Sequence, residues 1–390
     1  MPDSTSKSAV VVDVSWVNGL ATLRSLGRRG LRVFAIDHRP SALGLRSRYA
    51  QPVLAPEPVA DEEGFIQALR DLGKELRGPT PLFPTHDEHL NAIARHAGDL
   101  EDHYLFPFPD WKFLEGLQSK RLQLEKAEQE GIAVPWTVHP ASGAEARAAA
   151  KELGFPVLVK PSDNVVFKQL YKRQAFLCET PAELDEAYGL AEPFHPMVQE
   201  LIPGEIDALW TLGSYIGADG VPLGLFSGRK LKQTRGWTGH CRVGKAAWNE
   251  EVVATGLRLL RAFDFHGISQ VEFKRDARDG QLKLMEINPR LWQWHGLAAA
   301  CGVDLPWIAY RDLTGERLPP ARMVGEGKHW AISFVAGSPP GVQLPPYVDA
   351  VFVRDDMRPA VVQLARVAKN AVRRGKGPGP GRERPASANA

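Results

Sequence analysis

The stretch that decides the fold reads Val271-Glu272-Phe273-Lys274, then Arg275-Asp276-Ala277-Arg278-Asp279-Gly280, and after a short gap Leu284-Met285-Glu286-Ile287-Asn288-Pro289-Arg290. The polar middle, which ends in glycine, is typical of a hairpin loop between two strands. Because side chains alternate faces along a strand, Glu286 and Asn288 share one face. Across the hairpin, Glu272 has the parity and the distance from the loop to come near Glu286. The sequence therefore predicts two carboxylates and an amide oxygen on one face of a sheet.

Such a group of side chains has a chemical consequence. Two acids held together in a half-buried site repel each other unless a cation or a proton lies between them. Hard oxygen ligands suit Mg²⁺, whose remaining positions water and phosphate oxygens would fill. The alternative is a solvent-facing sheet surface whose charges pair with Lys274 or Arg290. That alternative is the better interpretation of Glu272 alone, but the whole run 286–290 with an upstream glutamate favours the metal site.

Upstream of this hairpin, the first hundred residues alternate strand and helix. Valine-rich Ala9–Val14, Leu31–Ile36 and Pro81–Pro84 are predicted strands, and the apolar spacing over Phe65–Leu76 predicts a helix. Repeated βα units imply a parallel sheet with helices on both faces, which is a doubly wound α/β domain.

The first turn of that domain excludes one class of function. Asp13–Gly19 lacks the G-x-G-x-x-G glycines that hold a dinucleotide pyrophosphate, which argues against a dehydrogenase. Asp37, at the end of the second predicted strand, is then best interpreted as a turn residue.

From Ser119 the pattern becomes α+β. We expect a helix after Ser119-Lys120, the helix Gly143–Leu153, and a buried strand, Phe155–Val159, that ends in Lys160. A large antiparallel sheet, interrupted by a helix over Glu250–Phe263, is expected from four further strands: Glu205–Ile216, Pro222–Phe226, Ile268–Lys274 and Leu282–Asn288. Ala360–Val372 is a candidate last helix, and Gly375–Ala390 has the composition of a flexible tail.

Composition and charge exclude several classes of protein. The 390 residues carry a formal net charge of +2, and 44% are hydrophobic, which excludes a wholly basic nucleic-acid binder and a disordered scaffold. The last 24 residues hold six basic residues and one acid, a net of +5, which leaves −3 for the rest. Three scattered cysteines, and the lack of a signal peptide or a long apolar run, predict a cytoplasmic protein without a transmembrane segment.

The order and spacing of these residues resemble the ATP-grasp superfamily, and within it the carboxylate–amine ligase-like branch. The resemblance covers about residues 117–320 and is preceded by an α/β domain where that family has one. It implies a Rossmann-like pre-ATP-grasp domain over residues 1–116 and an ATP-grasp domain with antiparallel sheets over 117–330. The latter divides into a small subdomain (117–198) and a large one (199–330). Residues 331–390 would be a C-terminal extension with a disordered basic tail.

The resemblance also implies roles for individual residues. Lys120 and Lys160 would be the two ATP lysines, with Lys160 reaching the α and β phosphates. The hinge that binds adenine would be Gln199, Glu200, Leu201 and Ile202, with Glu200 as its side-chain contact and Glu205 or Asp207 on the ribose. Glu272, Glu286 and Asn288 match the ligands of Mg²⁺ (or Mn²⁺), and Arg290 matches the arginine that meets the γ-phosphate or the acyl phosphate.

Two segments leave the pattern incomplete. The family places a glycine-rich loop over the phosphates, but residues 162–169 contain no glycine, so Lys168, Lys172 or Arg173 would have to supply charge there. The basic stretch Gly228–His240 resembles the segment that faces the phosphates and the acceptor. Arg229, as a catalytic residue, and Lys232 are its candidates; a solvated loop is the alternative.

Two further groups have a structural and a functional interpretation. Trp292, Trp294 and His295, on a predicted helix, could line an acceptor pocket, although packing under the sheet is the commoner role. Thr85 and Asp87 follow a predicted strand of the first domain, where ligands of such sheets bind. A helix N-cap is the commoner explanation of these two residues.

The function implied is that of an ADP-forming ligase. ATP would phosphorylate a carboxylate, and an amine would then attack the acyl phosphate to form an amide or peptide bond. The cofactors are ATP and Mg²⁺ (or Mn²⁺), and the substrates are a small carboxylate and amine, amino acids or peptides, with no specific nucleic acid. The alternatives are thiol ligation or phosphoryl transfer by the same fold, or a non-catalytic ATP-binding regulatory protein. A homodimer and the role of the tail stay open.

Overall fold

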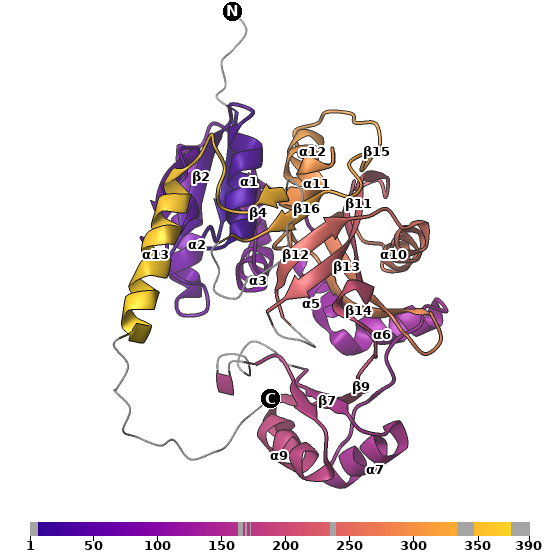
Figure 1. Cartoon of the computed structure of the whole chain (residues 1–390). Helices are drawn as coiled ribbons and strands as arrows, with labels where there is room; N and C mark the ends of the chain where they lie inside the picture. Colours follow the sequence, from indigo (N-terminus) through magenta and orange to yellow (C-terminus); the bar gives the residue numbers. More distant parts are fainter. Residues whose placement is uncertain are drawn as a thin grey trace, which may run out of the picture.

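The computed structural model describes residues 7–162, 167, 170–171, 173–234, 239–333 and 347–375, with side chains as far as residue 369. The described strands form three sheets, one parallel, one antiparallel and one mainly antiparallel (Figure 1). The predicted combination of a doubly wound α/β unit with antiparallel sheets is confirmed. Residues 1–6, 163–166, 168–169, 172, 235–238, 334–346 and 376–390 lie outside the described residues. They include most of the glycine-free loop, with Lys168 and Lys172, and most of the basic tail.

The N-terminal sheet has the order β3-β2-β1-β4-β5, and all its pairings are parallel. Its strands are β1 (Ser8–Val12), β2 (Arg32–Asp37), β3 (Ala50–Leu54), β4 (Thr80–Pro84) and β5 (Tyr104–Leu105). The helices of this unit are α1 (Val17–Gly27), α2 (Glu62–Glu75), α3 (Asp87–Arg95) and α4 (Ala97–Leu100), with a 3-10 turn, η1 (Gly44–Arg46). Because successive side chains point to opposite faces, Val11 packs with α1 while Val10 and Val12 pack with α2 and α3.

Strand β3 was missed by the sequence analysis. It reads Ala-Gln-Pro-Val-Leu and is largely exposed, so it has no buried apolar run that could indicate a strand. It lies at the sheet edge, where Pro52 is tolerated because only one side of the strand must pair. Only its pairing with β2 defines it.

The small antiparallel sheet has the order β6-β9-β7-β8. Its strands are β6 (Thr137–Val138), β7 (Val157–Lys160), β8 (Phe176–Cys178) and β9 (Met197–Glu200). Two helices with alanine-rich faces, α7 (Gly143–Leu153) and α9 (Pro181–Ala191), cover one face and bury β7 beneath them. A 3-10 turn, η2 (Glu192–Phe194), leads into β9. Helices α5 (Trp111–Gln118) and α6 (Lys120–Gln129) connect this sheet to the N-terminal unit.

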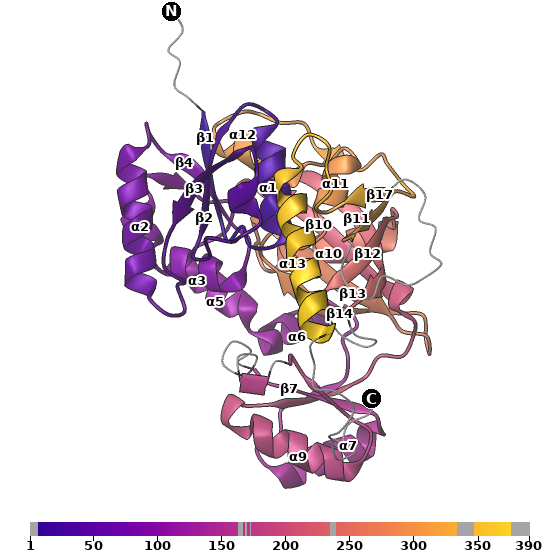
Figure 2. The ribbon, with the colours of Figure 1, turned by 60° about the vertical axis from the view of Figure 1, so that its left-hand side comes forward.

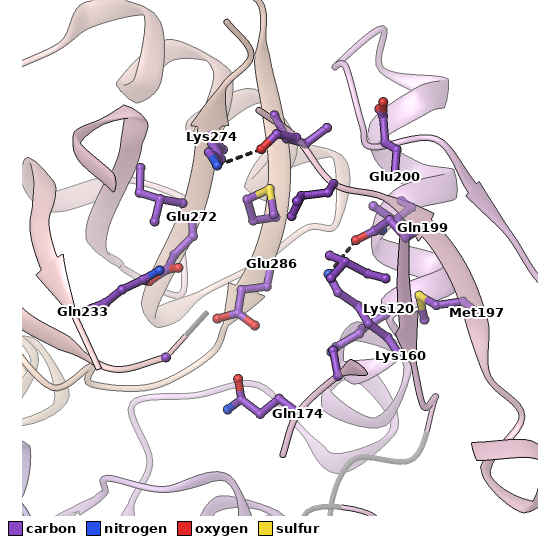
Figure 3. A pocket seen from close by; sticks show the side chains of 18 of the residues that line it. Lys120, Lys160, Gln174, Met197, Gln199, Glu200, Gln233, Glu272, Lys274 and Glu286 are labelled. Carbon is purple, nitrogen blue, oxygen red and sulfur yellow. Dashed lines mark hydrogen bonds between the residues drawn. The ribbon is translucent and has the colours of Figure 1, made fainter. Parts of the chain in front are cut away.

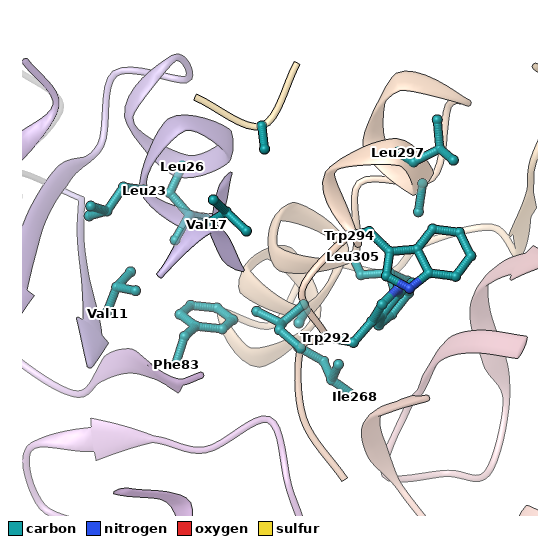
Figure 4. Packing of buried hydrophobic residues seen from close by; sticks show 14 of the residues in the cluster. Val11, Val17, Leu23, Leu26, Phe83, Ile268, Trp292, Trp294, Leu297 and Leu305 are labelled. Carbon is teal, nitrogen blue, oxygen red and sulfur yellow. The ribbon is translucent and has the colours of Figure 1, made fainter. Parts of the chain in front are cut away.

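The large sheet has the order β14-β13-β10-β11-β12-β16-β17, and β15 pairs with β11. Its strands are β10 (Leu209–Ile216), β11 (Pro222–Gln233), β12 (Cys241–Ala246), β13 (Gly267–Arg275), β14 (Leu282–Asn288), β15 (Ala321–Arg322), β16 (His329–Ala331) and β17 (Tyr347–Asp349). Helix α10 (Glu250–Ala262) covers one face. The other face packs on α11 (Gly296–Ala300), α12 (Leu305–Leu313) and the N-terminal unit, through a shared core (Figure 4).

Two predicted strand boundaries in this sheet are wrong. The strand expected over Glu205–Ile216 begins only at Leu209, after a 3-10 turn, η3 (Ile206–Ala208). The strand expected over Pro222–Phe226 continues to Gln233, so the first half of the basic stretch is strand rather than loop. Its charged side chains therefore alternate between two environments.

The tryptophans after β14 belong to the shared core. Trp292, Trp294 and His295 precede α11 rather than lying on a helix, and all three are buried. The tip of the Trp292 ring lies 2.0 Å from where a Cβ on Gly213 would be, so only glycine admits it. The packing interpretation of the tryptophans is confirmed, and a pocket-lining role is not supported.

The last described element is α13 (Arg358–Gly375), which confirms the helix expected over Ala360–Val372. Figures 1 and 2 show it in yellow along the outside of the N-terminal unit. The segment before it is held by a buried ion pair between Arg24 Nε and Asp356 Oδ2 at 2.9 Å.

Candidate active site

A cleft of about 1160 Å³, partly open to solvent, lies between the small sheet and the large sheet (Figure 3). Strands β7 and β9 and the first turn of α6 line one wall, and strands β11, β13 and β14 line the other. One part is apolar, with Leu158, Met197, Ile202 and Met285 among its side chains. The opposite part is charged, with lysines 120, 160 and 230 and glutamates 272 and 286.

The two predicted carboxylates face each other across β13 and β14. Glu272 and Glu286 are direct partners in the antiparallel register. Burial raises the pKa of Glu272, although Lys230 opposes this with a 2.8 Å ion pair from Nζ to Oε2. Burial also pushes the pKa of Glu286 upward, but Lys120 and the Asn288 amide outweigh it and leave that pKa lowered.

These residues fit a hard cation by their chemistry. Asn288 Nδ2 donates to Glu286 Oε1 at 3.0 Å, so the amide lies beside the carboxylate pair, as predicted from strand parity. Among the described residues, no three His, Cys, Asp or Glu side chains gather, so the donor set consists of two carboxylates and one amide. Two carboxylates held side by side, one buried and one half-buried, favour a cation between them, and oxygen ligands suit Mg²⁺.

Two lysines lie close together on the other wall. Lys120 is the first residue of α6, after the Ser119 cap, and Lys160 is the last residue of β7. Burial and the charge of Lys120 lower the pKa of Lys160 to about 7, and burial lowers the pKa of Lys120. Lys160 Nζ donates to Gln199 Oε1 at 2.5 Å. A phosphate between two such ammonium groups would stabilise both charged forms.

The hinge residues differ in their orientation. Leu201 and Ile202 line the cleft, and the Ile202 carbonyl accepts a bond from Lys274 Nζ at 2.7 Å. The Glu200 carboxylate points away from the cleft in Figure 3 and accepts bonds from the Trp136 backbone N–H, Lys283 and Arg278. The geometry therefore favours a positioning role for the Glu200 side chain over direct contact with a base.

The two candidate ribose ligands lie outside the cleft lining. Glu205 precedes the turn η3, and Asp207 lies within it. Asp207 Oδ2 is 3.4 Å from Arg229 Nη1 and is half exposed. Neither acid is among the residues that line the cleft in the described part of the chain.

The basic stretch supplies a residue that the sequence analysis missed. Lys230, rather than Arg229 or Lys232, lines the cleft. Arg229 points to the other side, toward Asp207 and the Trp210 ring. Continuing the alternation of β11 through the basic run would have separated Arg229 from Lys230, but the run was interpreted as a loop.

Arg290 meets the N-terminal unit. Its Nε and Nη2 bind the two carboxylate oxygens of Asp87 at 2.5 and 2.9 Å. The helix-cap interpretation is wrong, because the residue at the cap of α3 is His86 and the Thr85 hydroxyl donates to the Asp13 carbonyl. Asp87 is instead the first residue of α3, and its ion pair with Arg290 links the N-terminal unit to the residues that follow β14.

Two curated proteins are related to this chain in sequence. The chain is 25% identical over 264 residues to a D-aspartate ligase from Enterococcus faecium, a match covering 64% of this chain and 63% of that protein, which is less than two thirds of it. It is 26% identical over 327 residues to a D-alanine–D-alanine ligase from Paracidovorax citrulli, covering 78% and 86% of the two chains. No protein-family model matches the chain.

The fold has counterparts among solved structures. A biotin carboxylase from Campylobacter jejuni superposes with a TM-score of 0.64 at 17% identity, covering 80% of this chain and 72% of that one. Together with the cleft between the small and large sheets, this likeness shows an ATP-grasp fold. The two sequence relatives, at 25% and 26% identity, are both ligases named for a D-amino acid. None of the described helices is both long and apolar enough to cross a membrane.

Proposed function

We propose that the protein is an ATP-dependent ligase that joins a small carboxylate to an amine through an acyl phosphate, with Mg²⁺ (or Mn²⁺). One observation carries this proposal. One cleft has a buried and a half-buried carboxylate in register on one wall and two half-buried lysines on the other, beside an apolar section. Each pair of like charges is costly by itself, and a metal-bound polyphosphate would neutralise both.

Each residue has a defined part in that reaction. Lys120 and Lys160 bind phosphate oxygens as point charges, and Lys230 brings a third cation to the same end of the cleft. Glu272, Glu286 and Asn288 would hold the metal, which when bound neutralises charge developing on the transferred phosphate. Gln199 orients Lys160 through its hydrogen bond, and the backbone of residues 199–202 would bind the base.

The chemistry needs no nucleophile from the protein. A substrate carboxylate oxygen attacks the γ-phosphorus, and the bond to the β-phosphate oxygen breaks to release ADP. The amine nitrogen then attacks the acyl carbon, phosphate leaves, and the nitrogen loses a proton. Arg290 lies at the end of β14 where it would stabilise the anionic phosphate or carboxylate. An amino acid or short peptide is the substrate class that the two ligase relatives support.

The test is ADP release with Mg²⁺ and pairs of amino acids, D-enantiomers included, followed by product mass. Condensation to a species lighter by one water than the two substrates supports the proposal. If ATP binds but no carboxylate–amine pair gives turnover, the ligase assignment fails. A thioester or a stable phosphorylated product would assign the same site to thiol ligation or phosphoryl transfer. A non-catalytic regulatory protein would bind ATP and release no ADP with any acceptor. We also propose action in the cytoplasm on small molecules, with the oligomeric state set by measurement.

A further inference from the structure

The outward face of α13 is apolar, which is unusual for a helix on the outside of a protein. Met357, Val361 and Leu364 have exposed fractions of 46%, 64% and 42%. Ala365 and Ala368 are exposed as well. These five residues, spaced at i, i+4, i+7, i+8 and i+11, fall on one side of a helix. We call them the apolar stripe.

The opposite side of α13 already has its contacts. Ala360 is fully buried against the N-terminal unit, and Arg366 donates to the Ser41 carbonyl. Just before the helix, Asp355 binds Arg28 and Asp356 binds Arg24. The helix is therefore fixed by its inner face, and α13 itself lies on the outside of the N-terminal unit (Figures 1 and 2). The exposed fractions place the apolar stripe on its solvent side.

The charged residues of α13 itself have one sign. Arg358 and Lys369 are exposed along one edge of it. From Met357 to Arg382 the sequence contains no acidic residue, and it includes four more basic residues after Lys369 before Glu383: Arg373, Arg374, Lys376 and Arg382. A helix with an apolar face and basic flanks lies in the interface of a membrane that carries anionic headgroups.

Two other partners that could cover the apolar stripe, the C-terminal residues of the chain and a second copy of it, match its chemistry less well than a lipid surface does. Residues 376–390 contain no large apolar side chain with which to cover it. A second copy of the chain would bring two sets of like basic charges together, which opposes association. An anionic lipid surface matches both the apolar and the basic parts.

We propose that the apolar stripe of α13, with Arg358 and Lys369, docks this protein reversibly on an anionic lipid surface. Docking would leave the ATP cleft free, because the cleft lies between the small and large sheets whereas α13 lies on the N-terminal unit. The attachment is weak and salt-sensitive, since one helix face and a few cations supply it.

The test is co-sedimentation of the full chain with vesicles of phosphatidylcholine alone and of phosphatidylcholine mixed with phosphatidylglycerol. We expect binding to the mixed vesicles only, reduced by added salt. Val361→Gln with Leu364→Gln removes apolar surface without adding charge, and should weaken binding by about tenfold. Val324→Gln is the matched control, because Val324 is 85% exposed on another part of the surface, and should leave binding unchanged.

Two further variants separate the contribution of the basic residues of α13 to vesicle binding from that of the residues after Gly375. Arg358→Gln with Lys369→Gln should lower the preference for phosphatidylglycerol, while truncation after Gly375 should weaken binding without abolishing it. The proposal is overturned if the wild type binds neither vesicle at low salt, or if the Val361/Leu364 variant binds as the wild type does. It is also overturned if truncation alone removes all binding, or if sedimentation velocity shows a dimer that the Val361/Leu364 variant loses.

Discussion

Two charged regions of this molecule are built in opposite ways. In the cleft, like charges lie together: Glu272 opposite Glu286, and Lys120 beside Lys160. Opposite charges lie together where α1 and α3 meet Arg290, Asp304 and residues 350–356, a contact that we call the seam. Arg24 pairs with Asp356, and Arg290 pairs with Asp87.

The difference separates structural charges from functional ones. A buried ion pair satisfies its own members, so it requires no ligand and holds two segments together. The cleft also holds one such pair, Lys230 with Glu272, but its neighbouring like charges shift each other's pKa values and favour a bound counter-charge. The cleft should therefore respond to mutation mainly in activity, and the seam mainly in stability.

The largest effect is expected from Glu286→Gln in the cleft. Turnover should fall by at least about 10³-fold, or about 4 kcal/mol, because half of the carboxylate pair that would hold the metal is lost. The urea midpoint should stay near that of the wild type, since glutamine keeps the shape and can still pair with Asn288. An unfolding transition that shifts as much as turnover does would contradict the distinction between cleft and seam.

On the seam, Arg24→Met should lower the free energy of unfolding by about 3–5 kcal/mol. Arg24 donates to Asp356 and to the carbonyls of Ala350 and Val351, so its loss leaves a buried carboxylate without its cation. Urea unfolding measures this, and the KM for ATP should not change.

The control for that variant lies one turn further along α1. Arg28→Met breaks an ion pair with Asp355 whose members are each about 40% exposed. It should cost about 1 kcal/mol or less. Equal costs for Arg24→Met and Arg28→Met would show that burial does not set the strength of the seam.

A third expectation concerns pH. The pKa of Lys160 is about 7 in the free protein, and a bound polyphosphate favours its charged form, which raises that pKa in the complex. Binding energy from this charge is fully present below pH 7 and is lost as pH rises toward the pKa in the complex. ATP affinity, measured by calorimetry with Mg²⁺, should therefore fall by up to about tenfold per pH unit above 7.

Lys160→Arg provides the comparison, because arginine stays charged throughout this range. Whatever the absolute affinity of this variant for ATP, that affinity should not change with pH above 7. A slope that persists in Lys160→Arg would assign the titration to another group.

The smallest effect is expected from Asp87→Asn. The pair with Arg290 is only partly buried, so its loss should cost about 1 kcal/mol of stability or less. Turnover should stay within about threefold of the wild type, because Asp87 belongs to the seam. A loss of turnover comparable to that of Glu286→Gln would mean that Asp87 positions Arg290 for catalysis, and the two regions would then be one.

Local patterns predicted much of this structure. Helix α7 and strand β14 begin and end at the residues expected. Alternation and loop length predicted that Glu272 would come near Glu286, but the exact facing of the two depends on a β-bulge between Glu272 and Phe273. The predictions were wrong for segments whose strand character has no local sequence signal. Strand β3 has no apolar run, and the last part of β11 is a strand although its sequence is basic.

By itself, the sequence determined the class of fold and the residue types that face the cleft, since both depend on periodicities of two and 3.6 that operate over a few residues. Only the tertiary structure decided which partner each charge meets. Arg290 finds Asp87 across 203 positions, and Arg24 finds Asp356 across 332. The same fold turns Glu200 away from the cleft, brings Lys230 rather than Arg229 into it, and leaves the apolar stripe of α13 outside. Such pairings depend on how whole sheets pack, which no local pattern encodes.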